Sequence, residues 1–315
     1  MFHPFLTKLV TIMKKLGLAT ALLLAMTGAQ AYQFEVQGQS EFLDTTENNQ
    51  NFTGAVQGTY YFKNVDATKG PLAEAAFLNQ ASNVALAYQY AQYDAPRDEG
   101  RSDVESHVYG AKAEAYVPTQ LVPVYASAAY SHTINDSKNN LEFDDQGDRY
   151  ALELGAVVAP NFLVAVGYTS VADQTSYDAF NILSNGVAKA ALESGTIAED
   201  QDAITARTKY VGAIDGTNMA VGFEAGLVYG ESTAYNLKTD LYLTPALSVG
   251  ASYMESSYND SPNKAWGANV NYFITPAVSV GASYVNANFE AAKAAEEDAD
   301  VLDTQTVGVN AKFRF

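Results

Sequence analysis

Histidine and serine are the residues in this sequence that could support acid–base or nucleophilic catalysis. His107 and His132 each lie near a serine, as a phospholipase would require, whereas His3 lies in the N-terminal segment. A lone histidine beside a serine in an alternating segment is more often an exposed polar residue. The sequence contains no G-x-G-x-x-G, phosphate-binding loop or H-E-x-x-H motif, and no cysteine. We therefore predict no enzyme active site, no cofactor and no metal site.

Charged residues recur at alternate positions in segments that are otherwise rich in glycine, serine and amides. Because side chains alternate between the two faces of a strand, their parity places them on one polar face. The basic members are Lys63, Lys112, Arg149, Arg207, Lys209, Lys238, Lys312 and Arg314, and the acidic members are Glu35, Glu41, Glu114, Glu153, Glu224 and Asp240. Both signs occur in similar number, so this face is predicted to meet water. Eleven of these residues are predicted to line the pore: Lys112, Glu114, Arg149, Glu153, Arg207, Lys209, Glu224, Lys238, Asp240, Lys312 and Arg314.

The elements that must carry these charges are long strands with a period of two. In residues 265–274, Trp266 and Val270 share the apolar face, while Gly267 and Asn269 share the polar face. Such segments are long enough to cross a bilayer at a tilt, which takes about 9–11 residues. A β-sandwich would instead bury large aliphatic side chains between its sheets. A sheet in lipid must close, so we predict an all-β transmembrane antiparallel β-barrel with charges lining its lumen.

Turns and loops set the number of strands. Residues 243–253 recur as residues 274–284, and a proline separates two strands in each copy. Tight turns are predicted near 118–121, 159–161, 215–218, 244–246 and 275–277, and long polar loops near 44–51, 94–103, 134–148, 174–203, 231–234, 258–264 and 290–303. The exception is 65–82, a longer segment on the short-turn side. The pattern predicts about fourteen strands with short periplasmic turns and long extracellular loops.

Both ends of the sequence carry targeting features. Residues 1–31 are predicted to be a secretory signal peptide with an upstream extension or a long basic region, because an apolar run is followed by Ala29 and Ala31 before a cleavage site. Residues 32–315 then form a single barrel. At the other end, Phe313 and Phe315 share the apolar parity of their strand, and a terminal aromatic resembles the signal read by the outer-membrane assembly machinery.

Together with the segment Lys69-Gly70-Pro71-Leu72-Ala73-Glu74-Ala75-Ala76-Phe77-Leu78, these features resemble the porins of gammaproteobacteria. The resemblance covers essentially residues 32–315. It implies passive diffusion of small hydrophilic solutes and ions across the outer membrane of a Gram-negative bacterium, and a homotrimer as in general porins. It also implies sixteen strands as the alternative to fourteen.

The net charge of −18 argues against a nucleic-acid partner, since phosphates attract the opposite sign. Because the strand charges nearly balance, the acidic excess belongs to the loops, for example residues 144–148 and 296–300. These runs are either a solvated surface or an acidic vestibule that concentrates cations or holds divalent ions bridging lipopolysaccharide. The second interpretation predicts a weakly cation-selective channel in a lipid bilayer.

Loop 174–203 is the longest and contains a helix-like piece at Val187–Glu193. We predict that it folds inward and narrows the pore, so that its acids oppose wall bases such as Arg207 and Lys209. The acids are Asp178, Glu193, Glu199, Asp200 and Asp202. The alternative is a loop that only covers the mouth. A structural or adhesive barrel with little conductance stays open as a second class of function.

Overall fold

The computed structural model describes residues 31–45, 51–97, 100–137, 144–174, 176–197, 200–257, 263–290 and 301–315. The predicted signal peptide up to residue 30, Glu199 and the acidic run 296–300 lie outside these ranges. None of the helices in the described part is long and apolar enough to cross a membrane.

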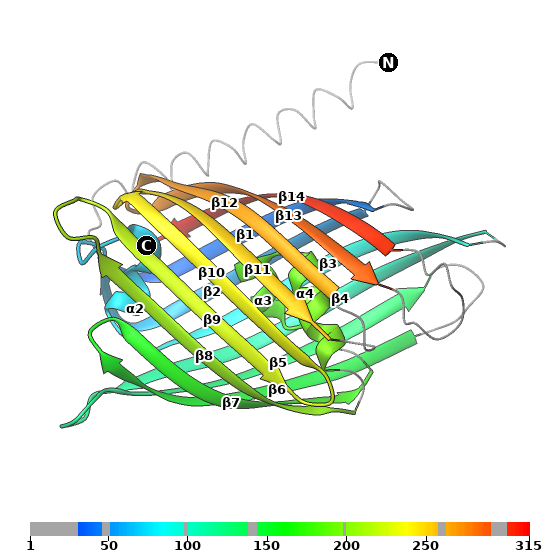
Figure 1. Ribbon diagram of the computed structural model, residues 1–315, viewed down its shortest axis with the longest axis horizontal. Helices are drawn as coiled ribbons and strands as arrows, with labels where there is room; N and C mark the ends of the chain where they lie inside the picture. The colour runs from blue at the N-terminus through cyan, green and yellow to red at the C-terminus, as the bar shows by residue number, and fades with distance from the viewer. Residues whose placement is uncertain are drawn as a thin grey trace, which may run out of the picture.

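The described residues form one closed antiparallel barrel of fourteen strands, in which each strand pairs with its neighbours in sequence and β1 pairs with β14 (Figure 1). The strands are β1 Ala31–Thr45, β2 Asn51–Asp66, β3 Asn83–Arg97, β4 Gly100–Val117, β5 Val124–Ser137, β6 Asp144–Ala159, β7 Phe162–Asp173, β8 Asp202–Ala213, β9 Ala220–Tyr229, β10 Thr233–Thr244, β11 Leu247–Ser256, β12 Asn263–Thr275, β13 Val278–Glu290 and β14 Val301–Arg314. The predicted fourteen strands are confirmed, and sixteen is wrong.

The tight turns also fall where the sequence places them, as between β10 and β11 at residues 245–246 and between β12 and β13 at 276–277. The predicted loops 94–103 and 134–148 are too long, because β3 and β4 stay paired as far as Arg97 opposite Gly100, and β5 and β6 as far as Asp136 opposite Asp144. Polar residues there made both hairpins look like loops. A ladder that extends beyond the membrane can carry polar side chains on both faces, so composition does not mark its end.

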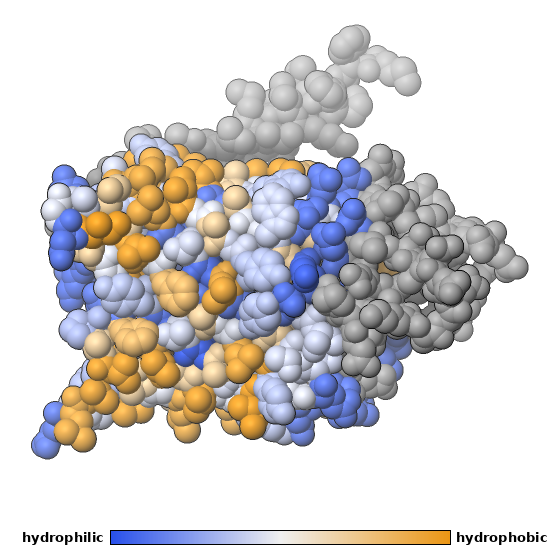
Figure 2. All heavy atoms as spheres, in the orientation of Figure 1, coloured by the Kyte–Doolittle hydropathy of each residue, from blue (hydrophilic) through white to orange (hydrophobic). Residues whose placement is uncertain are grey.

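Alternation along each strand separates an apolar outer face from a polar inner face. On β6, Leu152 and Leu154 are 58% and 65% exposed, whereas Arg149, on the opposite face of the strand, is 4% exposed. Figure 2 shows apolar residues over the visible wall and hydrophilic residues gathered toward its ends. This is the arrangement a barrel needs in lipid, because a charged side chain facing hydrocarbon is costly while one facing an aqueous lumen is not.

The seam between the first and last strands ends at the terminal residue. The Phe34 and Gln33 amides donate to the Phe315 carbonyl at 2.8 and 3.0 Å, and the Phe315 amide donates to the Phe34 carbonyl at 2.9 Å. The Phe315 ring stacks on Phe34 with centroids 5.6 Å apart. The last residue therefore completes both the hydrogen-bond ladder and an aromatic contact on the outer face.

Two inserted segments occupy the barrel interior at opposite ends (Figure 1). The loop between β7 and β8 forms α3, Ala179–Asn185, and α4, Val187–Thr196, on the long-loop side. The segment between β2 and β3 forms η1, Leu72–Glu74, and α2, Ala75–Leu78, on the turn side. We call the first the α3–α4 plug and the second the η1–α2 segment.

Candidate functional site

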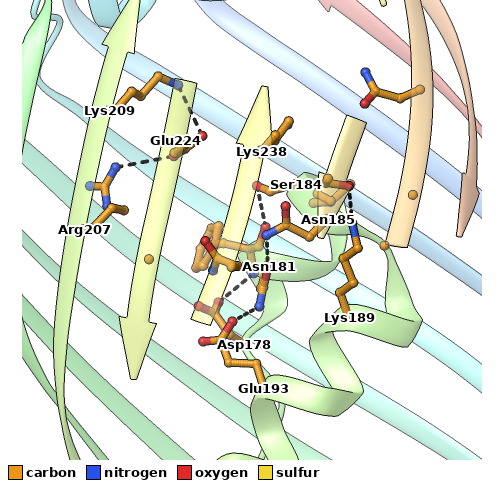
Figure 3. A pocket seen from close by; sticks show the side chains of 18 of the residues that line it. Asp178, Asn181, Ser184, Asn185, Lys189, Glu193, Arg207, Lys209, Glu224 and Lys238 are labelled. Carbon is orange, nitrogen blue, oxygen red and sulfur yellow. Dashed lines mark hydrogen bonds and ion pairs between the residues drawn. The ribbon is translucent and has the colours of Figure 1, made fainter. Parts of the chain in front are cut away.

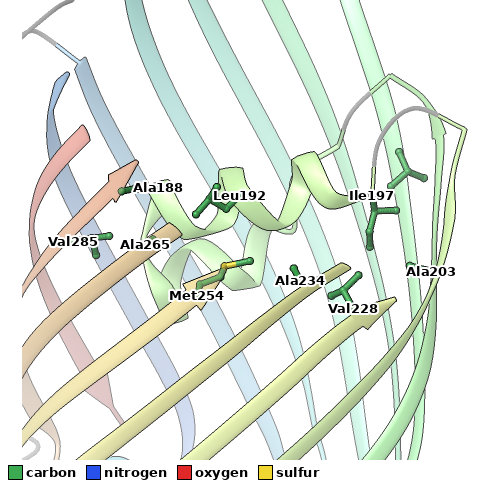
Figure 4. Packing of buried hydrophobic residues seen from close by; sticks show 11 residues of the cluster. Ala188, Leu192, Ile197, Ala203, Val228, Ala234, Met254, Ala265 and Val285 are labelled. Carbon is green, nitrogen blue, oxygen red and sulfur yellow. The ribbon is translucent and has the colours of Figure 1, made fainter. Parts of the chain in front are cut away.

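The α3–α4 plug rests on two apolar clusters inside the barrel. On one side, Phe180 and Leu183 of α3 pack against small side chains of β2 and β3 and Val108 of β4. A Cβ added at Gly110 would lie 2.7 Å from the Ala179 Cβ, so this glycine lets α3 approach β4 closely. On the other side, Leu192 of α4 packs with residues of β9 to β13 (Figure 4). Apolar burial thus holds the plug against the wall.

Hydrogen bonds join the plug to several strands. Glu41 Oε2 of β1 accepts from the Val187 amide at 2.7 Å, which caps the first turn of α4. Gly186, with φ of +87°, forms the turn between the two helices beside the same carboxylate. At the other end of α4, the Thr196 and Ser256 hydroxyls lie 2.6 Å apart. The plug is therefore anchored at both ends of α4.

A polar cavity of about 580 Å³ lies between the plug and the η1–α2 segment (Figure 3). Seven basic side chains line it: Lys112, Arg149, Lys189, Arg207, Lys209, Lys238 and Lys312. Seven acidic side chains also line it: Glu35, Glu74, Glu153, Asp178, Glu193, Glu224 and Asp240. The formal charges of the cavity lining therefore cancel, so the excess acid of the chain lies elsewhere.

Nine of the eleven residues predicted to line the pore lie at this cavity. The other two, Glu114 and Arg314, are not among the residues that line it. Glu114 is 3.0 Å from Lys112 Nζ and accepts from Tyr125 at 2.8 Å. Arg314 donates to Glu35 at 2.7 Å and is 2% exposed, with its guanidinium 4.6 Å from the Tyr32 and Phe273 ring centroids. Arg314 thus makes buried contacts within the protein and is not accessible to a solute in the cavity.

A chain of ion pairs crosses the wall from β6 to β9. Arg207 contacts Glu153 at 3.0 Å and Glu224 at 3.7 Å, and Lys209 lies 3.9 Å from Glu224. The strand register explains this arrangement, since Lys209 and Glu224 are directly opposite on β8 and β9. Opposite charges that face each other across two neighbouring strands, such as Lys209 and Glu224, stabilise the pairing of those strands.

The predicted partners of the loop acids are wrong. Glu193 lies 3.0 Å from Arg149, not beside Arg207 or Lys209, and it also accepts from Asn181. Asp178 lines the cavity and caps Phe180, with its carboxylate accepting from that amide at 2.9 Å. The inward fold of the loop is therefore observed, but its acids meet a different base.

Asp200 and Asp202 do not enter the lumen at all. Asp200 is exposed and accepts from the Asp173 amide at 3.1 Å. Asp202 opens β8 on the outward parity and accepts hydrogen bonds from Tyr168 and Ser170 on the outer face. The fifth acid, Glu199, lies outside the described residues. Only Asp178 and Glu193 of the predicted set reach the cavity.

The carboxylate nearest to Lys209 belongs to the segment 65–82, for which the sequence predicted no role. Glu74 of η1 lies 3.0 Å from Lys209 Nζ and accepts from the Tyr242 hydroxyl at 2.7 Å. Burial would raise the pKa of Glu74, but Lys209 and Tyr242 outweigh it and lower that pKa. Two features of the sequence indicate this insertion. Segment 65–82 is too long for a tight turn, and it contains the apolar run Ala75–Leu78.

The electrostatics of α4 differ from those of the wall. Burial raises the pKa of Glu193, Arg149 opposes the shift and Asp178 adds to it. Burial also lowers the pKa of Lys189 to about 8, and the charge of Lys238 adds to that effect. The described residues contain no group of three or more histidine or acidic side chains able to hold a metal ion.

Comparison with known proteins identifies the family to which this barrel belongs. A family model described as "Putative general bacterial porin" matches residues 6–315. The chain belongs to this porin family. The crystal structure of the Acinetobacter baumannii outer membrane protein Omp33 is similar to this porin, with 52% identity over 91% of this chain and 100% of that chain, and a TM-score of 0.65. The localisation predicted from the sequence, the outer membrane, agrees with both findings.

A more distant structure shares only the fold. The CymD monoaromatic hydrocarbon channel superimposes on the porin with a TM-score of 0.56 at 9% identity, covering 90% of this chain and 89% of that one. A search of curated proteins found no match. The fold is thus that of outer-membrane barrels, and the family is that of general bacterial porins.

Proposed function

We propose that this porin is a diffusion channel for small hydrophilic solutes and ions, narrowed by the α3–α4 plug. The observation that supports it most is the polar cavity of about 580 Å³ inside a closed barrel, lined by seven basic and seven acidic side chains. Water must solvate so many charges, because burying them in a dry interior would cost several kcal/mol each. A wetted lumen in an outer-membrane barrel is a route for polar solutes.

Selectivity is proposed to arise at the extracellular mouth. The cavity lining has equal numbers of both signs, whereas the whole chain carries a net charge of −18. An acidic mouth raises the local concentration of cations, and the effect is screened by salt. We therefore propose weak cation preference that is set by the loops.

A structural or adhesive barrel with little conductance is the second candidate, and the packing of the plug supports it. Leu192 and Phe180 are buried against opposite parts of the wall, and Leu72 of the η1–α2 segment is hydrogen-bonded to Pro245 and Arg314 at 2.8 Å. Both ends of the lumen are thereby obstructed by ordered elements. If neither element moves, few solutes pass.

Recording from purified protein in planar bilayers separates the two candidates. A diffusion channel gives stepwise currents whose reversal potential in a salt gradient has the sign of cation preference. Folded protein that inserts without producing steps would contradict the channel and favour the structural role. Anion preference would still support a channel, but it would mean that the basic side chains of the wall, and not the acidic loops, determine the selectivity.

A further inference from the structure

Lys189 is a buried cation without a nearby counter-ion. It is 3% exposed, and its ammonium donates to the Ser252 hydroxyl. Among the described residues no carboxylate oxygen lies within 4.0 Å of it, whereas Lys112, Lys209 and Lys312 each have a carboxylate oxygen at 3.0 Å. Buried charges in proteins are normally paired. This cation therefore has unused capacity for a negatively charged group.

The surroundings of Lys189 form a small polar recess on β10, β11 and β12. Lys238 is directly opposite Ser252, which is directly opposite Gly267, so the three positions form a row across the strands. A Cβ at Gly267 would lie 3.1 Å from the Lys189 ammonium and 3.2 Å from the Ser252 hydroxyl oxygen. The missing side chain at this position thus leaves room for the ammonium.

A second cation faces the same recess with a weak partner. Lys238 Nζ lies 3.9 Å from Asp240, and that carboxylate also accepts from Asn269 at 3.2 Å. Lys189, Lys238, Ser252 and Asn269 all line the cavity. Figure 3 shows Lys189 rising from α4 on the side of the cavity away from Arg207 and Lys209. Lys189 therefore lies away from the ion-pair chain on β6 to β9, whereas Lys238 is directly opposite Glu224 at the end of that chain.

We propose that Lys189 and Lys238, with the Ser252 hydroxyl, form a binding subsite for small carboxylate solutes in the lumen. Two ammonium groups and a hydroxyl offer donors to both oxygens of a carboxylate, and hydrogen bonds to charged groups are about twice as strong as neutral ones. The subsite deepens the proposed channel function, since it names one class of solute that the lumen holds.

The charges around the recess favour a group that carries a single negative charge, such as one carboxylate. Asp240 on β10 and Glu224 on β9 face Lys238, and Glu41 on β1 acts on Lys189 from the N-terminus of α4. The ion pairs already formed by Glu224 and the capping bond made by Glu41 leave the two lysines only partly neutralised. A single group that carries more than one negative charge, such as phosphate, would be repelled more strongly by these three carboxylates, whereas each carboxylate of succinate carries one charge.

Equilibrium binding tests the subsite without requiring that the solute cross the membrane. Sodium succinate is titrated into the folded, detergent-solubilised protein by calorimetry at low, constant ionic strength and pH 7, and inorganic phosphate is the second probe. Lys189→Gln and Lys238→Gln should each weaken succinate binding by about 10- to 100-fold, the loss expected for one charge-assisted contact. Lys189→Arg should retain binding.

Lys264→Gln is the matched control, because Lys264 makes the same charge change on the exposed outer face of β12. Succinate binding that is absent in the unchanged protein, or equal in all variants, would overturn the proposal. Tighter binding of phosphate than succinate would overturn its carboxylate specificity. Binding without membrane currents would contradict the channel function and leave the subsite standing, whereas currents without binding would do the reverse.

Discussion

Docking of the α3–α4 plug should depend strongly on Leu192. This side chain is 3% exposed and packs among residues of β9 to β13 (Figure 4). Leu192→Ala removes most of that contact and leaves a cavity, which costs about 2–5 kcal/mol at a buried site. A loss of about 3 kcal/mol in docking free energy raises the undocked population roughly 150-fold.

Thiol labelling measures that population directly, since the chain has no cysteine of its own. Ala190, which is 1% exposed on α4, is replaced by cysteine in both backgrounds. When opening and closing are fast, the rate of modification by a water-soluble thiol reagent follows the open fraction. We expect Leu192→Ala to raise the labelling rate by about two orders of magnitude and to increase the mean current in planar bilayers.

Leu152→Ala is the matched control, because Leu152 is 58% exposed on the lipid face and distant in sequence from the plug. It should change neither the labelling rate nor the current. Apolar docking of the plug is contradicted if Leu192→Ala folds to the same heat-modifiable barrel and labels no faster than the Leu152→Ala control. That result would mean that the hydrogen bonds of the plug, and not its apolar face, hold it in place.

Three further predictions concern assembly, pH and salt. Phe315→Ala should lower the amount of folded, heat-modifiable protein in outer membranes, because the Phe315 ring stacks on Phe34 at the barrel seam; normal folded levels would contradict this. Binding of succinate should weaken as pH rises through about 8, where Lys189 loses its proton, and Lys189→Arg should remove that dependence; an unchanged pH profile in the arginine variant would contradict the assignment. Cation preference should diminish between about 0.1 M and 1 M salt as the screening length falls from about 10 to 3 Å; selectivity that does not vary with salt would place its origin inside the lumen.

The sequence predicts the barrel well because strand parity is a local property. Alternation at Trp266 and Val270 against Gly267 and Asn269 requires no knowledge of distant contacts, and the prolines at 245 and 276 mark the turns. The lumen charges follow from the same parity. The structure differs from the prediction where polar residues belong to strands, at the β3–β4 and β5–β6 hairpins and at Asp202, which points outward.

The partners inside the lumen could not be predicted, because they join segments far apart in the chain. Glu74 meets Lys209, Glu193 meets Arg149 and Lys189 meets Ser252. Each contact depends on how an inserted segment packs against apolar patches of the wall. These patches consist of small residues such as Ala265 and Ala87, which in the sequence resemble any other lumen-facing position. Only after the plug is placed do its side chains have neighbours.

Adjacent positions on β6 offer the most direct test of a barrel with lipid outside and water within. Ala151 lines the cavity, and Leu152 is exposed on the opposite face. Nitroxide labels at these two positions, in protein reconstituted in bilayers, are compared for collision with oxygen and with a water-soluble nickel chelate. We expect nickel access at residue 151 and oxygen access at residue 152. Equal access of both reagents at both positions, or a label at 152 that neither reagent reaches, would contradict this expectation.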